Sequence, residues 1–203
     1  MIRRVPLLAT LLVAVAVAAM ILLGIWQISR AHWKEGLLAT YTAAQGLPPI
    51  AFPTAPLKGD LPLYRRASGH CLQVVGWRAV SGENRAGEGG YAHLADCSTG
   101  AEGPGMVVVA GWSKDPNAKA DWRGGPVGGV IGPDQKNRMR LVSAQGLGGL
   151  EASAPPSLDN IPNNHRAYAA QWFIFAAIAL VIYFIALRKR FSEAPKPKDE
   201  PQP

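Results

Sequence analysis

A cluster of polar and aromatic side chains precedes the second long apolar segment of the chain, in Pro162-Asn-Asn-His-Arg-Ala-Tyr-Ala-Ala-Gln-Trp172. If a helix starts at one of the two asparagines, which are favoured caps, four residues share one face of it at steps of three, four and seven: His165, Tyr168, Ala169 and Trp172. A neutral imidazole is a standard axial ligand of haem iron, and the small alanine leaves room for a flat ligand or another helix. A histidine that caps the helix at a membrane interface is the simpler interpretation of the residues alone, and both interpretations stay open.

Basic side chains near this histidine could pair with the carboxylates of a haem at the water boundary. They are Arg166, which follows it, and Arg30 or Lys34, which follow the first apolar segment. Gln171 lies inside the second apolar segment, where an amide needs a polar partner. We expect that partner near Gln27 at the end of the first segment.

The other three histidines have ordinary interpretations. His70 and His93 fall in predicted strands, where we expect partly exposed side chains, and His32 is expected to be an interfacial residue of a helix. The sequence contains none of the motifs G-x-S-x-G, Walker A, H-E-x-x-H and C-x-x-C, and its acidic residues are scattered. We therefore expect a binding or scaffolding protein and not an enzyme.

The two cysteines, Cys71 and Cys97, both fall between the apolar segments. In an extracytoplasmic compartment a disulfide is the default state of such a pair, and closing a loop of this length would stabilise the domain by about 3 kcal/mol. The spacing matches no metal-ligand motif, and His70 is the only adjacent residue of a ligand type. A disulfide is the favoured interpretation, and a free thiol pair stays open because the sequence does not give the separation of the two side chains.

Two apolar runs set the architecture: Val5–Trp26, and Ala167–Leu187, which is interrupted only by Gln171. Each run can cross the roughly 30 Å hydrocarbon core of a bilayer at about 1.5 Å per helical residue. A cleaved signal peptide is the alternative for the first run. Because this run exceeds a typical signal-peptide core and continues without a helix break, we expect it to remain as a transmembrane helix.

Basic residues at the outer ends of both runs set the predicted orientation: Arg3, Arg4, Arg188, Lys189 and Arg190. We expect both termini in the cytoplasm and the intervening domain on the other side of the membrane. Because residues 1–4 are too few for a mitochondrial transit peptide, the predicted location is the bacterial inner (plasma) membrane.

The net charge of +7 does not indicate a nucleic-acid partner. Residues 27–166 hold 14 Lys and Arg against 11 Asp and Glu, hence only +3, and the remainder lies at the two ends. No basic stripe interleaved with aromatic residues occurs, so we exclude nucleic-acid binding.

The patterns divide the chain into six predicted segments. These are a cytoplasmic N-terminus 1–4, a transmembrane helix 5–26, a juxtamembrane helix 27–46, an extracytoplasmic β-rich domain with connectors 47–166, a transmembrane helix 167–187 and a disordered cytoplasmic tail 188–203. Short apolar segments separated by glycine-rich turns predict a compact antiparallel sheet or small barrel. The predicted fold class is membrane α + β, with two transmembrane helices flanking an extracytoplasmic, mainly antiparallel β domain.

Four motifs resemble, in the same order, those of the Surfeit-locus family of cytochrome c oxidase assembly proteins. They are Leu23-Gly-Ile-Trp-Gln-Ile-Ser-Arg30 with Trp33-Lys34, Tyr64-Arg-Arg66, Gly111-Trp112 and Pro162–Trp172. The first and last motifs, at the ends of the two apolar runs, are the more specific. The chain therefore resembles a bacterial member of this family.

The resemblance implies a factor that binds haem a transiently and assists its insertion into the catalytic subunit of a haem–copper cytochrome c oxidase. It implies that His165 is the ligand of the haem iron. Six further residues at motif positions are candidates for the haem site: Arg166, Tyr168, Trp172, Trp26, Gln27 and Arg30. The resemblance assigns no role to Trp26, Gln27, Arg30 and Trp33, for which we expect packing against the second helix and contact with haem or the oxidase. The implied partners are the oxidase catalytic subunit and membrane lipid, with the haem a synthesis machinery as a further possible partner.

Two alternatives remain open. In the first, the protein is a membrane-anchored scaffold that stabilises an oxidase assembly intermediate without binding haem, and His165 only caps a helix. In the second, Cys71 and Cys97 act as a thiol pair in copper or redox chemistry.

Overall fold

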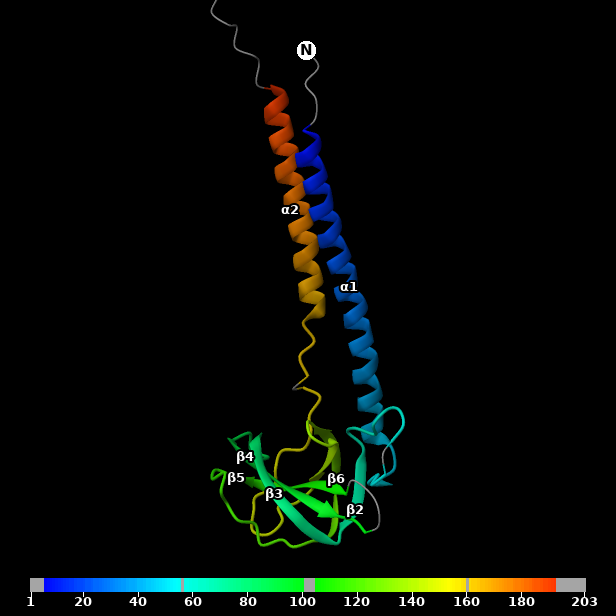
Figure 1. The fold of residues 1–203 in the computed structure, drawn as a ribbon, viewed down its shortest axis with the longest axis vertical. Helices are drawn as coiled ribbons and strands as arrows, with labels where there is room; N and C mark the ends of the chain where they lie inside the picture. The colour runs from blue at the N-terminus through cyan, green and yellow to red at the C-terminus, as the bar shows by residue number, and fades with distance from the viewer. Residues whose placement is uncertain (1–5, 56, 101–104, 160, 193–203) are drawn as a thin grey trace, which may run out of the picture. The chain divides into compact units, whose positions relative to one another are not determined.

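The computed structural model describes residues 6–55, 57–100, 105–159 and 161–192. They form two compact units, one of residues up to Gly36 and from Pro162 onwards, the other of Leu37–Ile161. Two long helices, α1 (Leu7–Gly46) and α2 (His165–Ser192), flank seven strands (Figure 1). The strands are β1 (Ile50–Ala51), β2 (Arg66–Cys71), β3 (Gln73–Glu83), β4 (Gly89–Ser98), β5 (Met106–Ser113), β6 (Gly125–Asp134) and β7 (Arg138–Ser143).

Both helices are long and apolar enough to cross a membrane. Their large apolar side chains are mostly exposed, for example Leu8 and Leu22 on α1 and Ile174 and Ile182 on α2. A helix that is apolar on its exposed faces suits lipid, whereas an apolar helix in a water-soluble protein is buried in the core. The two helices therefore have the character of membrane anchors at either end of a sheet domain, which confirms membrane α + β as the fold class.

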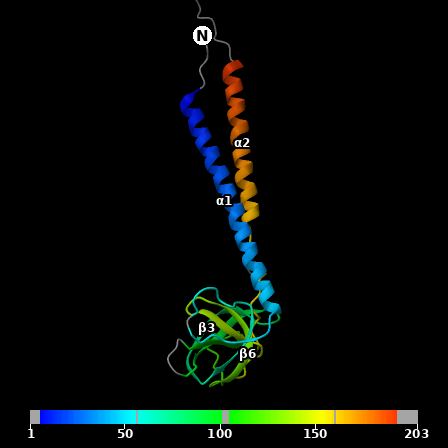
Figure 2. The same ribbon diagram turned by 90° about the vertical axis from the view of Figure 1, so that its right-hand side faces the viewer.

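α1 and α2 run side by side in opposite directions (Figures 1 and 2). The fully buried residues of their contact line are small or short and recur at heptad intervals: Val17, Gly24 and Ala31 on α1, with Ala169 and Ala176 on α2. This spacing is the seam of a coiled-coil-like helix pair. Small residues at such a seam let two helices pack closely in lipid, where apolar burial alone gives no preference.

The ends of the helices follow the sequence with one correction. α1 continues through the predicted juxtamembrane segment and ends at Gly46, before Pro48 and Pro49, which cannot continue a helix. α2 extends to Ser192, so residues 188–192, predicted to be part of a disordered tail, are helical. Lys189 and Arg190 in the last turn favour this extension, because cations stabilise the negative end of a helix. Residues 1–4 and the tail from 193 lie outside the described residues.

The strands form one sheet in the order β1-β2-β6-β7-β5-β4-β3. Only Leu72 separates β2 from β3, so that a single bent strand pairs with β6 through its first half and with β4 through its second. This bent strand closes the sheet into a small barrel. If it is counted as the first strand, the order around the barrel is 1-2-3-5-4-1, the Greek-key connectivity of an OB-fold.

The sheet is mixed, although most of its pairings are antiparallel. The pairs β2–β6, β3–β4, β4–β5 and β6–β7 are antiparallel, whereas β1–β2 and β5–β7 are parallel. The prediction of a mainly antiparallel domain missed the two parallel pairings. A Greek-key barrel places its third and fifth strands side by side, and nothing in the local sequence of β5 or β7 reveals this neighbour.

The larger core cluster of the barrel contains Cys71 on β2 and Cys97 on β4. The structure joins them in a disulfide with a Cα–Cα distance of 5.3 Å, and both are buried. Since Cys71 lies just before the bend and Cys97 pairs with Val74 just after it, the disulfide links the bend to the neighbouring strand.

Two of the sequence expectations concern histidines of the barrel. His70 is exposed, but His93 is buried, with Nε2 2.8 Å from Oγ of Ser113. The prediction of a partly exposed His93 was therefore wrong. A bulge between His93 and Leu94 breaks the simple alternation of β4 against β5, which the sequence pattern does not show.

Candidate functional site

A hydrogen bond joins the two end motifs of the chain. His165, the first residue of α2, places Nδ1 2.7 Å from Oε1 of Gln27 on α1. An amide oxygen can only accept, so Nδ1 carries the proton and donates it to this bond. In the neutral ring the unprotonated atom is then Nε2, whose lone pair is available to a ligand. The imidazole is therefore oriented in the way that a second partner commonly orients a metal-binding histidine.

The start of α2 fixes the place of this imidazole. The backbone N–H of Tyr168 donates to the carbonyl of Asn164 at 3.1 Å, which puts Asn164 at the N-cap position. The predicted asparagine start of the helix is thus correct. His165 consequently lies in the first turn, beside α1.

One flank of the α1–α2 seam carries charged contacts. Nε and Nη2 of Arg166 lie 2.9 and 3.0 Å from the two carboxylate oxygens of Glu35, and Nζ of Lys34 donates to the carbonyl of Pro162. The Arg166–Glu35 pair is exposed and contributes little stability. It does occupy Arg166 with a protein carboxylate, whereas the sequence suggested a haem carboxylate as its partner.

Among the exposed side chains of the end motifs, four concern the sequence predictions and lie on the other flank. In an antiparallel helix pair, residues that directly precede a seam position on either helix lie on the same flank. The four are Trp26, Arg30, Tyr168 and Gln171. They directly precede the seam residues Gln27, Ala31, Ala169 and Trp172, in that order.

Arg30 on this flank is held by an aromatic neighbour. Its guanidinium carbon lies 4.1 Å from the ring centroid of Trp33, a cation–π contact. Gln171 is exposed on the same flank, and the amide of Gln27 bonds His165 instead. The prediction that Gln171 finds its partner near Gln27 was therefore wrong. Gln171 is two residues beyond the buried Ala169, which turns it away from α1.

The structure thus distributes the seven residues suggested for haem over three places. His165, Gln27 and Trp172 lie at the seam, where the half-buried Trp172 packs edge-on against Phe175 at 6.3 Å between ring centroids. Trp26, Arg30 and Tyr168 lie on the open flank, and Arg166 lies on the charged flank. Among the described residues, no group of three His, Cys, Asp or Glu side chains is placed to hold a metal ion.

The barrel contains a buried charge cluster that the sequence interpretation missed. Nη2 of Arg78 on β3 donates to both carboxylate oxygens of Asp134 on β6, at 2.9 and 2.8 Å, and Arg140 on β7 lies 4.0 Å from the same carboxylate. The side chain of Asp134 is only 2% exposed. The sequence pattern gave no signal of it, because Arg140 stands between the buried Met139 and Leu141, where alternation predicts an outward-facing side chain.

The charged groups of this cluster shift one another's pKa values. Burial alone would raise the pKa of Asp134, but the hydrogen bonds from Arg78 and from the backbone of Asn137, with the charges of Arg78 and Arg140, lower it below its usual value. Burial lowers the pKa of Arg140; the charge of Asp134 opposes this effect and that of Arg78 adds to it. The cluster therefore holds a charged carboxylate between two guanidinium groups.

Comparison with known proteins gives one family match, which covers most of the chain. The family model of the SURF1 family matches residues 14–177, a range that includes both end motifs and the whole barrel. No curated protein matches the chain.

Proposed function

Because the chain belongs to the SURF1 family of cytochrome oxidase assembly proteins, we propose that it binds haem a as cargo and assists its insertion into the catalytic subunit of a haem–copper oxidase. The family itself is one of assembly factors and not a class of catalysts. The protein would therefore make and break no covalent bond, and its task is to hold and release the haem.

The hydrogen bond between His165 and Gln27 carries this proposal. In the neutral ring it favours the proton on Nδ1 and directs the lone pair of Nε2 away from Gln27. An imidazole in this state is a suitable axial ligand for haem iron. The residues present thus fit the group, with His165 as the iron ligand.

The open flank supplies the remaining contacts of the proposed site. Trp26 and Tyr168 are exposed aromatic side chains there, and Arg30 adds a cation stacked on Trp33. Aromatic faces suit a porphyrin, and the guanidinium suits a propionate carboxylate. A site with one protein ligand and an exposed edge binds more weakly than an enclosed pocket with more ligands, so transfer to the oxidase subunit is favourable.

The proposed location is the bacterial inner membrane, with the barrel on the extracytoplasmic side. The basic residues Arg188, Lys189 and Arg190 at the end of α2 support this orientation. The disulfide in the barrel supports it as well, because disulfides persist in oxidising compartments.

The test is the absorption spectrum of the full chain purified from cells that make haem a. We expect wild type to carry haem and His165→Ala to lose it at equal protein yield. His32→Ala is the matched control, since His32 is an exposed histidine on the same helix pair, and it should retain haem. Equal haem content in wild type and His165→Ala contradicts the proposal.

A scaffold without haem is the second candidate function, and the same hydrogen bond favours it in one respect. The bond ties α1 to α2 and so has a structural use whether or not iron is bound. In that case wild type carries no haem, yet it co-purifies with oxidase subunits, and His165→Ala reduces this association by loosening the helix pair.

A further inference from the structure

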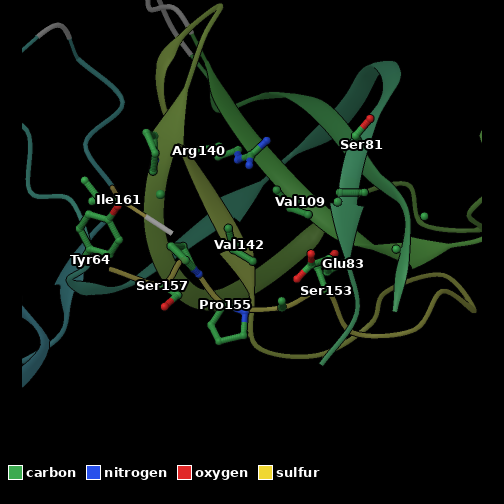
Figure 3. Close-up of a pocket in the computed structure, with 18 residues that line it drawn as sticks. Tyr64, Ser81, Glu83, Val109, Arg140, Val142, Ser153, Pro155, Ser157 and Ile161 are labelled. Atoms are coloured by element: carbon green, nitrogen blue, oxygen red, sulfur yellow. The ribbon is translucent and has the colours of Figure 1, made fainter. Parts of the chain in front are cut away.

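The barrel has a half-open pocket of about 760 Å³ that the proposed haem site does not use. Figure 3 shows Arg140 and Val142 on one ribbon of its wall and Ser81 and Glu83 on another, with Tyr64 and Pro155 also at its border. All of these residues belong to the unit Leu37–Ile161. The volume is in the range of pockets that bind small organic molecules, roughly 300 to 1,000 Å³.

Two polar atoms in the wall of this pocket are buried without a partner among the described residues: Nε of Arg140 and Oγ of Ser153. Ser153 is only 5% exposed. Buried donors and hydroxyl groups in folded proteins nearly always have a hydrogen-bond partner. Because each atom is itself covered, a polar group bound in the pocket would become its partner after a small shift of the side chain that carries it.

The unused donors of Arg140 indicate the sign of that group. Arg78 takes both oxygens of Asp134 at hydrogen-bond distance, whereas Nη1 of Arg140 lies 4.0 Å from the nearer one. Asp96 also lies beside Arg78, 4.0 Å from its Nε. Arg140 is thus the less satisfied of the two guanidinium groups. Glu83 is the one carboxylate in the described lining, and its side chain belongs to an exposed residue.

The rest of the wall is largely apolar. Ala92, Val109 and Val142 are buried members of one core cluster and line the pocket, together with Pro155 and Pro156. An anion that fits here must therefore carry an apolar body. A single planar guanidinium matches a carboxylate in charge and in its two-pronged geometry, whereas a doubly charged phosphate would call for further cations.

We propose that this pocket binds a small carboxylic acid with an apolar chain or ring, whose carboxylate pairs with Arg140 and accepts from Ser153. The inference concerns the barrel alone and does not rest on the proposed binding of haem. It assigns the barrel a ligand of its own.

The experiment is isothermal titration calorimetry of the full chain in detergent with two matched probes, 4-phenylbutyrate and 4-phenylbutanol. We expect the acid to bind at least tenfold more tightly than the alcohol. Arg140→Gln should abolish this preference, while Arg66→Gln, which removes an exposed cation of β2 outside the pocket, should leave it unchanged.

Ser153→Ala gives an independent variant, because a hydroxyl without a partner can be removed without loss of a hydrogen bond. We expect it to melt at the same temperature as wild type and to bind the acid several-fold more weakly. The proposal is wrong if neither probe binds, if acid and alcohol bind equally, or if Ser153→Ala and a folded Arg140→Gln both bind the acid as wild type does.

Discussion

Hydrogen bonds between single residues decide which atoms of this protein remain available for binding. Gln27 accepts from Nδ1 of His165, so in the neutral ring Nε2 is the atom left with a lone pair. In the barrel, Arg78 takes the hydrogen bonds of Asp134, and Arg140 keeps unused donors. In both places, the atoms that can bind a ligand are those that a neighbouring side chain leaves without a hydrogen bond.

Gln27→Leu removes the acceptor of the His165 bond, and we expect the haem content of the purified protein to fall by about tenfold, the lower end of the usual effect of losing such a second partner. Gln27→Glu retains an acceptor and should retain haem. The measurement is haem absorbance per protein at equal yield. Gln171→Leu is the control, since Gln171 is an exposed amide near the same end of α2. Unchanged haem in Gln27→Leu would show that the bond does not prepare the ligand.

Asp134 predicts a pH dependence of barrel stability. Its pKa is lowered on folding despite burial, by Arg78, Asn137 and Arg140. Its contribution is therefore present above the unfolded pKa of about 3.9 and is lost as the pH falls through the folded value. We expect Asp134→Asn to melt at a lower temperature than wild type at about pH 5. Between about pH 5 and pH 3, the melting temperature of the variant should fall by less than that of wild type.

The control for this comparison is Asp60→Asn, because Asp60 is exposed. It should follow wild type at both pH values. If Asp134→Asn and wild type lose the same number of degrees on acidification, the carboxylate is not held charged by the fold.

At the scale of elements, the α1–α2 pair depends on small residues at the seam. A Cβ atom built on Gly24 would lie 2.7 Å from the ring of Phe173, which is too close for an ordinary contact. The ring would have to leave its place against α1. The clashing atoms are the far end of an exposed side chain, so the ring can turn aside, and one methyl group at this point disturbs the pairing of the two helices only moderately.

We expect Gly24→Ala to destabilise the helix pair by about 1 kcal/mol, the lower end of the usual effect of overpacking, because the ring of Phe173 can move. The measurement is the loss of helical circular dichroism during titration with sodium dodecyl sulfate. Gly36→Ala is the control, because a Cβ there has nothing within 4 Å, and it should be neutral or slightly stabilising. Adding Phe173→Ala to Gly24→Ala should remove part of the defect. Identical behaviour of the two glycine variants contradicts the packing argument.

At the scale of the whole molecule, the chain combines an apolar helix pair with a barrel that has its own core and its own disulfide. Because Cys71 and Cys97 are bonded and buried, the structure offers no thiol pair for copper or redox chemistry among its described residues. We expect a maleimide reagent to label neither cysteine in the native protein. Both should react after reduction in denaturant, and labelling of the native protein would restore the thiol hypothesis.

The double variant Cys71→Ser with Cys97→Ser tests what the disulfide contributes to stability. The chain-entropy model predicts a loss of about 3 kcal/mol for a loop of this length. Thermal unfolding of the barrel, followed by near-ultraviolet circular dichroism, measures it. Arg66→Gln, the exposed barrel variant used above, should melt as wild type does.

The sequence by itself determined the features that depend on local pattern. The apolar runs, the break after Gly46 and the asparagine start at Asn164 follow from hydrophobic length, proline chemistry and capping. The β-rich character of the middle also follows from short apolar segments between glycine-rich turns. His165 stood out because a motif and a helical spacing coincide within a few residues.

Only the tertiary structure decided which distant residues meet. The His165–Gln27 bond, the parallel β5–β7 pairing and the sharing of Asp134 by Arg78 and Arg140 each join residues that are far apart or on different strands. No local periodicity encodes these pairings, because they depend on the connectivity of the barrel and the register of the helices. For the same reason, the sequence predicted that Gln171 would find its partner near Gln27, whereas in the structure Gln27 bonds His165.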